Sequence, residues 1–255
     1  MRRLLPLAVV LVAAAGCGAR THVAAPPAPT TTVREQPPPP RCAAGSVRRV
    51  GSARTAYLAF APHGAVAYRS PGRRPLARFG SKNVNGYPTV FGVVAARVAA
   101  DCRARWYRVE LPVRPNGATG WVPAAALRVE PVGARIEIDL SSRRLTLLRS
   151  GRPVLSATVA VGSPATPTPV GRYYVNQRLV PDDPKGPFGP AAIGISAFSP
   201  VLTGWAQGGP VAIHGTNEPW SIGHAVSNGC IRLPNPTLSR LFAVAVAGTP
   251  VIIHA

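Results

Sequence analysis

Proline and glycine interrupt this chain too often for it to fold into long helices. The 255 residues include 30 Pro and 25 Gly, and the apolar runs between them are short, such as Ala65–Tyr68 and Val90–Val94. Proline breaks a helix interior and glycine weakens it. Because 46% of the residues are hydrophobic and only 15% are charged, the chain does not have the composition of a highly charged disordered protein. The sequence therefore predicts a mainly β fold with many turns.

The first 17 residues have the organisation of a secretory signal peptide. Two arginines precede an apolar run that is shorter than the ~20 residues a transmembrane helix needs. The segment ends in Ala14-Ala15-Gly16-Cys17, which resembles a bacterial lipobox. That resemblance implies that Cys17 is lipidated and anchors the chain in the cell envelope, at the outer face of the cytoplasmic membrane. The alternative is an ordinary signal peptide with an unrelated cysteine, which implies a secreted or periplasmic protein.

A proline-rich stretch follows at residues 18–41 and contains the run QPPPPR. It has few large apolar side chains and cannot bury a core. Proline-rich chains extend by about 3.1 Å per residue, so this stretch could hold a domain ~50 Å from its anchor. We interpret it as a tether, and a proline-rich ligand for a partner domain is the alternative.

Two folded regions are expected after the tether, at residues 42–131 and 133–255. Between Cys42 and Glu130 there are 14 Lys and Arg residues against 3 acidic ones, whereas from Gly133 to the end there are 10 against 5. The net charge of +20 therefore belongs mainly to the first region. Such a surface attracts anionic cell-envelope polymers or a lipid surface. Nucleic acid is not an expected partner, because a secreted chain would rarely meet it.

The first region consists of short predicted strands separated by turns. The segment Trp106–Leu111 alternates as a half-buried strand does, residues 115–117 (PNG) form a turn, and Gly120–Val122 is a further strand. A strand reading WYRV, then a turn, then GWV resembles the end of bacterial SH3-like domains. The resemblance implies a small β-barrel.

Cys42 and Cys102 bracket most of this region. In an oxidising compartment such cysteines pair, and closing a loop of this size stabilises a fold by about 4 kcal/mol in the chain-entropy model. The sequence predicts a Cys42–Cys102 disulfide, with two separate buried thiols as the alternative.

The second region begins with three predicted strands joined by short turns. Arg135–Leu140 alternates strictly, Arg144–Leu148 returns after Ser141-Ser142, and Val154–Val161 follows a second turn. Near the end, Asn235 and Pro236 have the pattern of a helix N-cap and first helical residue. The predicted helix continues to Ala245, and residues 251–253 form a last strand.

Residues 214–230, which read HGTNEPWSIGHAVSNGC, concentrate the chemically reactive side chains. Cys230 has no obvious partner if Cys17 is lipidated and the other two cysteines pair. A thiolate is a strong nucleophile, and a nearby histidine can lower its pKa and carry its proton. The small Gly229 lets backbone N–H groups approach a substrate carbonyl, as an oxyanion hole requires. A small buried hydrophobic residue is the alternative interpretation of Cys230.

This stretch resembles the L,D-transpeptidase catalytic domain, the YkuD-like fold. The family has His-Gly, some dozen residues, and then Ser-His-Gly-Cys followed closely by Arg or Asn; His214-Gly215 and Ser227–Arg232 match, except at Asn228. Residues 162–171 (GSPATPTPVG) resemble the family's G…TPxG loop, and Phe188–Pro190 resembles a segment that lines its cleft. The likeness covers roughly residues 133–255. It implies a YkuD-like β-sandwich with one or two short helices.

The resemblance also implies catalytic roles. Cys230 is expected to be the nucleophile, and His214 the base that activates it, with the backbone carbonyl of Gly215 orienting the imidazole. The backbone N–H of Cys230, together with that of Gly229 or Asn228, is expected to stabilise the oxyanion.

Three further residues are expected to shape the substrate site. Ser227 and Arg232 flank the nucleophile, and Trp220 is expected to line the donor groove. Arg232 either pairs with a substrate carboxylate or serves as a structural clamp.

Asn228 is a departure from the family pattern, which most often has histidine there. Asparagine cannot take up a proton near neutral pH, so the base is assigned to the upstream His214, at the end of the apolar strand Val211–Ile213. His224, six residues before Cys230, is the alternative base.

The sequence therefore predicts a peptidoglycan L,D-transpeptidase that forms 3→3 cross-links through a thioester on Cys230. Peptidoglycan stem peptides are the expected partners, and no metal or cofactor is expected. An L,D-carboxypeptidase with water as acceptor is one alternative. A wall-binding lipoprotein with a decayed site, or a zinc site of Cys230, His214 and His224, are the others.

Overall fold

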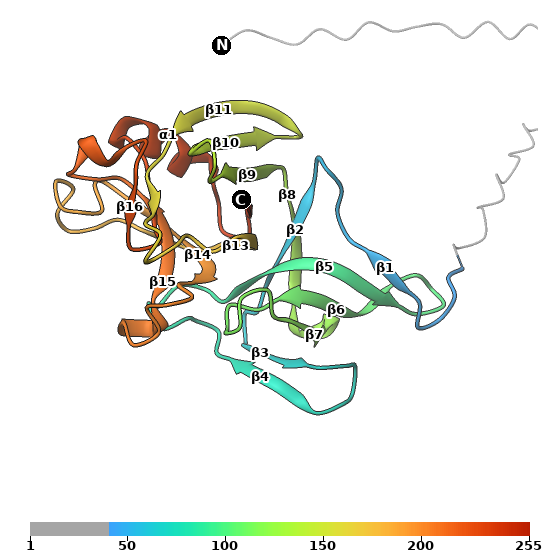
Figure 1. The fold of residues 1–255 in the computed structure, drawn as a ribbon. Coiled ribbons are helices and arrows are strands. Elements are labelled where there is room, and N and C mark those ends of the chain that lie inside the picture. Colours follow the sequence, from blue (N-terminus) through green and yellow to red (C-terminus); the bar gives the residue numbers. More distant parts are fainter. Residues whose placement is uncertain (1–40) are drawn as a thin grey trace, which may run out of the picture. The chain divides into compact units, whose positions relative to one another are not determined.

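The computed structural model describes residues 41–255, which fall within a single compact unit (Figure 1). The predicted signal peptide, the lipidation site Cys17 and nearly all of the proline-rich tether lie outside the described residues. Among residues 41–255, no helix has the length and apolar character to cross a membrane.

The first sheet is built from antiparallel strands between residues 47 and 132. Its order is β4-β3-β7-β6-β5-β2-β8, with β1 also paired to β5. The strands are β1 (Val47–Arg49), β2 (Ala56–Phe60), β3 (Ala65–Tyr68), β4 (Pro75–Phe79), β5 (Val90–Val98), β6 (Ala104–Glu110), β7 (Thr119–Pro123) and β8 (Arg128–Val132). Phe91, Val109 and Val122 are fully buried at its centre. Strand β7 alternates between buried and half-buried residues, whereas β5 is buried along most of its length. The SH3-like barrel stays a prediction.

The predicted disulfide between Cys42 and Cys102 is confirmed, with 5.1 Å between the two Cα atoms. It joins the segment before β1 to the turn between β5 and β6. The backbone N–H of Cys42 also donates to the carbonyl of Ala100 at 3.0 Å. The disulfide therefore fixes the start of the described chain to the long strand β5.

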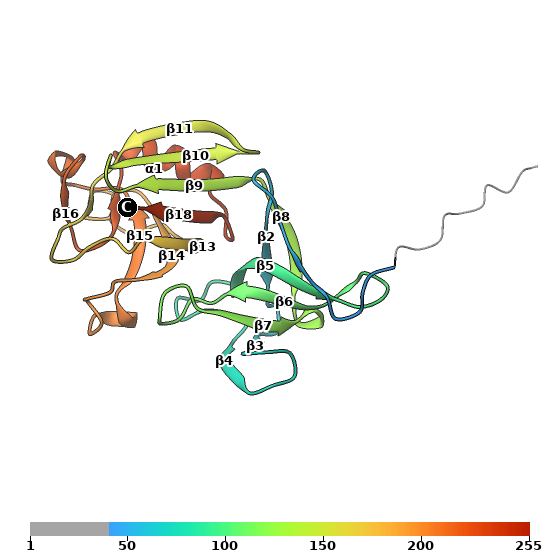
Figure 2. The same cartoon turned by 45° about the vertical axis from the view of Figure 1, so that its right-hand side comes forward.

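The second sheet has the order β11-β10-β9-β18-β13-β14-β15-β17 (Figure 2). Its strands are β9 (Ala134–Asp139), β10 (Arg144–Arg149), β11 (Arg152–Thr158), β13 (Gly171–Leu179), β14 (Ala192–Phe198), β15 (Pro210–His214), β17 (Ile231–Arg232) and β18 (Pro250–His254). The pairs β9–β18 and β15–β17 are parallel. A separate parallel pair joins β12 (Val161–Gly162) to β16 (Ala225–Ser227). The predicted three-strand meander corresponds to β9, β10 and β11.

Within the described residues there is one α-helix, α1 (Asn235–Val244), and it buries Leu238 and Leu241 in the core of the second sheet. The 3₁₀ segments are Ala124–Ala126, Ala206–Gly208 and Pro219–Ser221. The prediction of a mainly β protein with one or two short helices is therefore confirmed. The helix ends one residue earlier than predicted, at Val244. The predicted N-cap, Asn235, was also wrong by one residue, because Pro234 is the N-cap and no side chain caps the helix. This leaves the side chain of Asn235 available for another contact.

The two sheets share apolar and polar contacts. Leu58 and Val132, from β2 and β8, belong to the same hydrophobic core as Ile136 and Val251 of the second sheet. Gly248 permits this contact, because a Cβ atom there would collide with the side chain of Leu58. The sheets are also joined by hydrogen bonds from Arg114 Nη2 to the carbonyls of Ser199 and Gly208, and from the Asn83 and Asn85 amides to Gln177 Oε1.

Candidate active site

Two neighbouring parallel strands carry the predicted nucleophile and base. Strand β15 ends at His214, and β17 begins just after Cys230, with Ile213 opposite Ile231 in the register. The backbone N–H of Ala212 donates to Cys230 Sγ at 3.4 Å. Because alternate residues of a strand share a face, Ala212 and His214 lie on the same side of β15. The thiol therefore lies beside the strand that carries His214 two residues further on.

The imidazole of His214 is held in one orientation. Its Nδ1 lies 2.5 Å from the carbonyl oxygen of Gly215, and the ring of Phe188 packs edge-on against it with 5.0 Å between centroids. A carbonyl oxygen only accepts hydrogen bonds, so Nδ1 carries the proton and Nε2 keeps its lone pair. The expected orientation of His214 by the Gly215 carbonyl is thus present in the structure.

Burial decides the charge state of His214. The side chain is 4% exposed, and burial lowers its pKa to about 4, with a further lowering by Arg232 and an opposing effect of the Gly215 carbonyl. The imidazole is therefore neutral at physiological pH and can accept a proton at Nε2.

Burial acts in the opposite direction on Cys230. It raises the pKa of the thiol, while the Ala212 N–H and the positive charge of Arg232 lower it to a smaller extent. The resting pair is therefore a neutral thiol and a neutral imidazole, not a thiolate–imidazolium pair. Such a site forms the thiolate only when a base takes up its proton during attack.

Arg232 is held by Glu218 through a charge-assisted hydrogen bond of 2.5 Å from Nη1 to Oε2. The Arg232 side chain is 20% exposed and that of Glu218 45% exposed. The Nε of Arg232 is buried and has no hydrogen-bond partner among residues 41–255. The sequence left open a substrate contact or a clamp, and the structure places Arg232 in an ion pair within the protein, close enough to influence the pKa of both Cys230 and His214.

The turn before Cys230 is fixed by Ser227. Its Oγ donates to the carbonyl of Cys230 at 2.6 Å and accepts from the N–H of Gly229 at 3.1 Å. Gly229 has φ +104°, a conformation that favours glycine. The N–H of Gly229 is therefore already engaged, which argues against its expected part in the oxyanion hole. In the described chain, the N–H groups of Asn228 and Cys230 donate to no protein acceptor.

The loop that resembles the family's G…TPxG segment braces this turn. The hydroxyl of Thr166 donates to the carbonyl of Ser227 at 2.9 Å, and that of Thr168 donates to the carbonyl of Gly229 at 3.0 Å. Thr168 Oγ1 also accepts from the N–H of Gly162 at 2.8 Å. The two threonines thus fix the carbonyl directions of the turn from a segment some sixty residues earlier.

Asn235 is a site residue that sequence reasoning assigned to another role. Its Oδ1 accepts from the backbone N–H of Thr216 at 2.8 Å, immediately after Gly215, which orients His214. A Cβ atom at Gly189 or Gly215 would collide with this Oδ1, so both glycines are needed for the close approach. An Asn-Pro pair before a helix indicated only a cap, and no sequence signal pointed to this contact.

Three other predicted residues lie at the surface. Trp220 is 62% exposed on the 3₁₀ segment Pro219–Ser221. His224, the alternative base, is exposed, and its carbonyl accepts from the N–H of Val161 on β12. Asn228 is exposed as well. Among residues 41–255, no group of three His, Cys, Asp or Glu side chains is arranged to hold a metal ion.

Comparisons with known proteins identify the second region. The profile of the YkuD family, the L,D-transpeptidase catalytic domain, matches residues 133–253. The YkuD protein of Bacillus licheniformis is 37% identical over 169 residues, which cover 64% of this chain and 94% of that protein. YkuD of Bacillus subtilis is 35% identical over 119 residues, 47% of this chain, and this chain spans 65% of its length.

Among solved structures, the catalytic domain of the Enterococcus faecium L,D-transpeptidase shares 25% identity, with 48% of this chain and 96% of that chain covered and a TM-score of 0.36. By its sequence match to the Bacillus licheniformis protein over nearly all of that protein's length, this chain belongs to the YkuD family of L,D-transpeptidases.

Proposed function

We propose that this protein is a peptidoglycan L,D-transpeptidase in which Cys230 is the nucleophile and His214 the general base. The observation that carries the proposal is the hydrogen bond between His214 Nδ1 and the Gly215 carbonyl, on the strand whose Ala212 N–H contacts Cys230 Sγ. These contacts support the proposal because they hold the thiol of Cys230 and the imidazole of His214 at the same strand, β15, in a chain of the YkuD family.

The first half-reaction forms a thioester and releases D-alanine. Cys230 Sγ attacks the carbonyl carbon of the third residue of a tetrapeptide stem, while its proton passes to Nε2 of His214. The bond to the terminal D-alanine then breaks, and the leaving amine takes the proton from Nε2. The neutral imidazole that burial enforces is the state this step requires.

The negative oxygen of the tetrahedral intermediate needs hydrogen-bond donors. The N–H groups of Cys230 and Asn228 are the candidates, because Gly229 N–H is bound to Ser227 Oγ. Asn228 thus contributes its backbone, and this contribution does not depend on its side chain. Trp220 is proposed to line the groove for the donor stem.

The second half-reaction transfers the acyl group to an amine. The side-chain amine of a diamino acid on a neighbouring stem attacks the thioester carbonyl and gives its proton to His214. The carbon–sulfur bond breaks, the thiol of Cys230 is restored, and a 3→3 cross-link is formed. If water were the acceptor, the same site would release a tripeptide.

The cell-envelope location is part of the proposal. A lipid on Cys17, followed by the proline-rich tether, would hold the enzyme at the outer face of the cytoplasmic membrane. The first region, with 14 Lys and Arg against 3 acidic residues between positions 42 and 130, would then face anionic envelope polymers.

Product analysis tests the function directly. The purified protein is incubated with a disaccharide tetrapeptide whose third residue is a diamino acid, and the products are identified by mass spectrometry. Cross-linked dimers that have lost one D-alanine are expected, and Cys230→Ala should abolish them. Release of tripeptide without any dimer would show that the enzyme is a carboxypeptidase, and dimers formed by Cys230→Ala would contradict the assigned nucleophile.

A further inference from the structure

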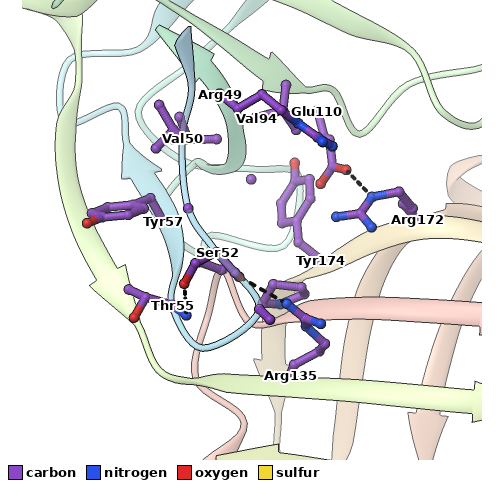
Figure 3. Close-up of a pocket in the computed structure, with 17 residues that line it drawn as sticks. Arg49, Val50, Ser52, Thr55, Tyr57, Val94, Glu110, Arg135, Arg172 and Tyr174 are labelled. Atoms are coloured by element: carbon purple, nitrogen blue, oxygen red, sulfur yellow. Dashed lines mark hydrogen bonds and ion pairs between the residues drawn. The ribbon is translucent and has the colours of Figure 1, made fainter. Parts of the chain in front are cut away.

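A cleft of about 420 Å³ lies between the first sheet and the second, away from Cys230 (Figure 3). None of the residues around the proposed nucleophile lines it. Its walls come from the β1–β2 connection, β5, β6, β9 and β13, and from the end of the chain near Gly248. The volume is in the range of small-molecule sites, which usually combine apolar walls with a few polar groups.

The hydroxyl of Tyr174 is an unpartnered polar group in this cleft. Tyr174 is 0% exposed, and its OH makes no hydrogen bond with any group in residues 41–255. A buried hydroxyl without a partner costs free energy that folding does not recover. Tyr174 contributes to the wall of the cleft, and its hydroxyl lies beneath the surface that a ligand could touch.

Glu110 and Arg172 form an incomplete ion pair in the same place. The Glu110 side chain, at the end of β6, is 15% exposed, and its Oε1 lies 4.0 Å from Arg172 Nε on β13. That separation is too long for a hydrogen bond. Burial raises the pKa of Glu110, and the charge of Arg172 opposes this only in part. Figure 3 shows Glu110, Arg172 and Tyr174 gathered on one side of the cleft.

Two features of the backbone place the Glu110 carboxylate beside Tyr174 and Arg172. A Cβ atom at Gly92 would lie 2.5 Å from Glu110 Oε2 and 3.2 Å from Tyr174 Cδ1, so the glycine on β5 leaves space for both side chains. Arg172 and Tyr174 are alternate residues of β13 and share a face.

A second cation is available at the rim. Arg49, at the end of β1, lines the cleft and is in no ion pair with another described residue. Arg135 also lines the cleft, but its guanidinium is occupied by Glu137 at 3.6 Å and by the carbonyl of Ser52 at 3.2 Å. Arg49 and Arg172 are therefore the lining arginines whose guanidinium groups make no hydrogen bond to a described residue.

We infer that this cleft binds a free α-amino acid in its zwitterionic form. Its ammonium group would donate to Glu110, and its carboxylate would accept from Arg172 and Arg49. The positive and negative groups of an α-amino acid are only a few ångströms apart, as are Glu110 and Arg172 at 4.0 Å. The remaining volume accommodates the amino-acid side chain against Val50, Val93 and Tyr57. This inference does not depend on the proposed transpeptidase activity.

Ligands of only one charge match the site less well. A simple anion would satisfy the arginines but would face Glu110, and a simple amine would satisfy Glu110 but would face Arg172 and Arg49. Like charges repel, most strongly at Glu110, whose side chain is 15% exposed, and less at Arg172, whose side chain is 69% exposed. The inference therefore predicts that both charges on one molecule are needed.

Calorimetric titration with alanine tests the inference. D-alanine and L-alanine are titrated separately into the full chain carrying Cys230→Ala, which cannot form a thioester, with propionate and ethylamine as single-charge analogues. Saturable binding of at least one alanine enantiomer is expected, with affinity at least tenfold above that of either analogue. Glu110→Gln and Arg172→Gln should each weaken alanine binding about tenfold or more. The matched control is Glu130→Gln, which changes a half-exposed carboxylate of β8 that is paired with Arg128. This variant should leave alanine binding unchanged.

Tyr174→Phe provides a variant that keeps its fold. It removes an unpartnered hydroxyl, so the free protein should be at least as stable in thermal unfolding, and alanine binding should persist because the hydroxyl is not exposed to the cleft. Propionate binding that equals alanine binding and survives Glu110→Gln would overturn the inference in favour of a plain anion site. Absence of saturable binding by either enantiomer, or binding unaffected by both Glu110→Gln and Arg172→Gln, would also overturn it.

Discussion

His214 Nδ1 lies 2.5 Å from the carbonyl oxygen of Gly215, the residue that follows it in the chain. This contact leaves Nε2 as the basic nitrogen, and burial keeps it unprotonated, with a pKa of about 4. In the proposed catalytic pair, the orientation and charge of the base are therefore set by a backbone carbonyl and by burial. The consequences can be measured.

The acylation rate should decline in acid only at a low pH. Because the folded pKa of His214 is about 4, the base stays neutral well below the ~6.5 typical of histidine. The rate of acylation by a carbapenem, measured by intact-mass spectrometry across pH, should fall as the pH passes through about 4. The exposed-histidine variant His224→Gln should retain this profile. An acidic limb centred near 6.5, or one that moves in His224→Gln, would contradict the assignment of His214.

The same lowered pKa predicts a loss of stability in acid. Below about pH 6.5 the unfolded chain takes up a proton that folded His214 takes up only near pH 4, so stability declines as the pH falls between these values. The gap corresponds to about 3 kcal/mol. Urea unfolding of the wild type and of His214→Gln should show that the variant lacks this part of the decline. If the free energy of unfolding fell equally with pH in both proteins, His214 would not be the cause of the decline.

Removing the nucleophile or the base should have unequal results. Cys230→Ala should abolish the carbapenem adduct, while His214→Ala should lower the acylation rate about 10³-fold because no other group takes the thiol proton. His224→Ala should react at close to the wild-type rate. If His224→Ala is the more impaired of the two histidine variants, His224 is the base.

The ion pair of Glu218 with Arg232 should influence the pKa of the Cys230 thiol. Arg232 lowers the pKa of both Cys230 and His214, and Glu218 partly neutralises it. Glu218→Gln should therefore lower the pH at which Cys230 reacts with iodoacetamide, whereas Arg232→Gln should raise it. Glu137→Gln, which breaks the comparably exposed ion pair with Arg135 on β9, is the control. Shifts in the same direction for both site variants would count against this interpretation.

The sequence predicted the parts of the structure that depend on local pattern. Strand β9 followed from strict alternation, β10 followed from the apolar run after the Ser141-Ser142 turn, and the Cys42–Cys102 disulfide followed from the compartment implied by the signal peptide. Cys230 and His214 were found because family resemblance and thiol chemistry pointed to the same segment. The assigned roles of the site residues and the boundary near residue 132 stay predictions.

Contacts across the fold were not predictable in this way. The Asn235 side chain meets the Thr216 backbone from the start of a helix, and its neighbours in sequence indicated only a cap. The N–H of Gly229 donates to Ser227 Oγ, whereas the sequence spacing predicted that this N–H could serve the oxyanion hole. Glu110 and Arg172 come from different sheets, and no periodicity relates two residues that meet only when the sheets pack.

Asn235 should act as a positioning residue for His214. Its Oδ1 accepts from the N–H of Thr216 at 2.8 Å, so Asn235→Ala leaves a buried backbone donor unpaired. That loss should cost about 1–3 kcal/mol of stability and slow acylation by loosening the segment that orients the imidazole. Asn235→Asp keeps an acceptor oxygen and should restore most of the acylation rate. Ser239→Ala, which removes only an exposed hydrogen bond to the carbonyl of Asn235, is the matched control. Equal acylation rates in Asn235→Ala and Ser239→Ala, at a temperature where both are folded, would show that the Thr216 contact is structural only.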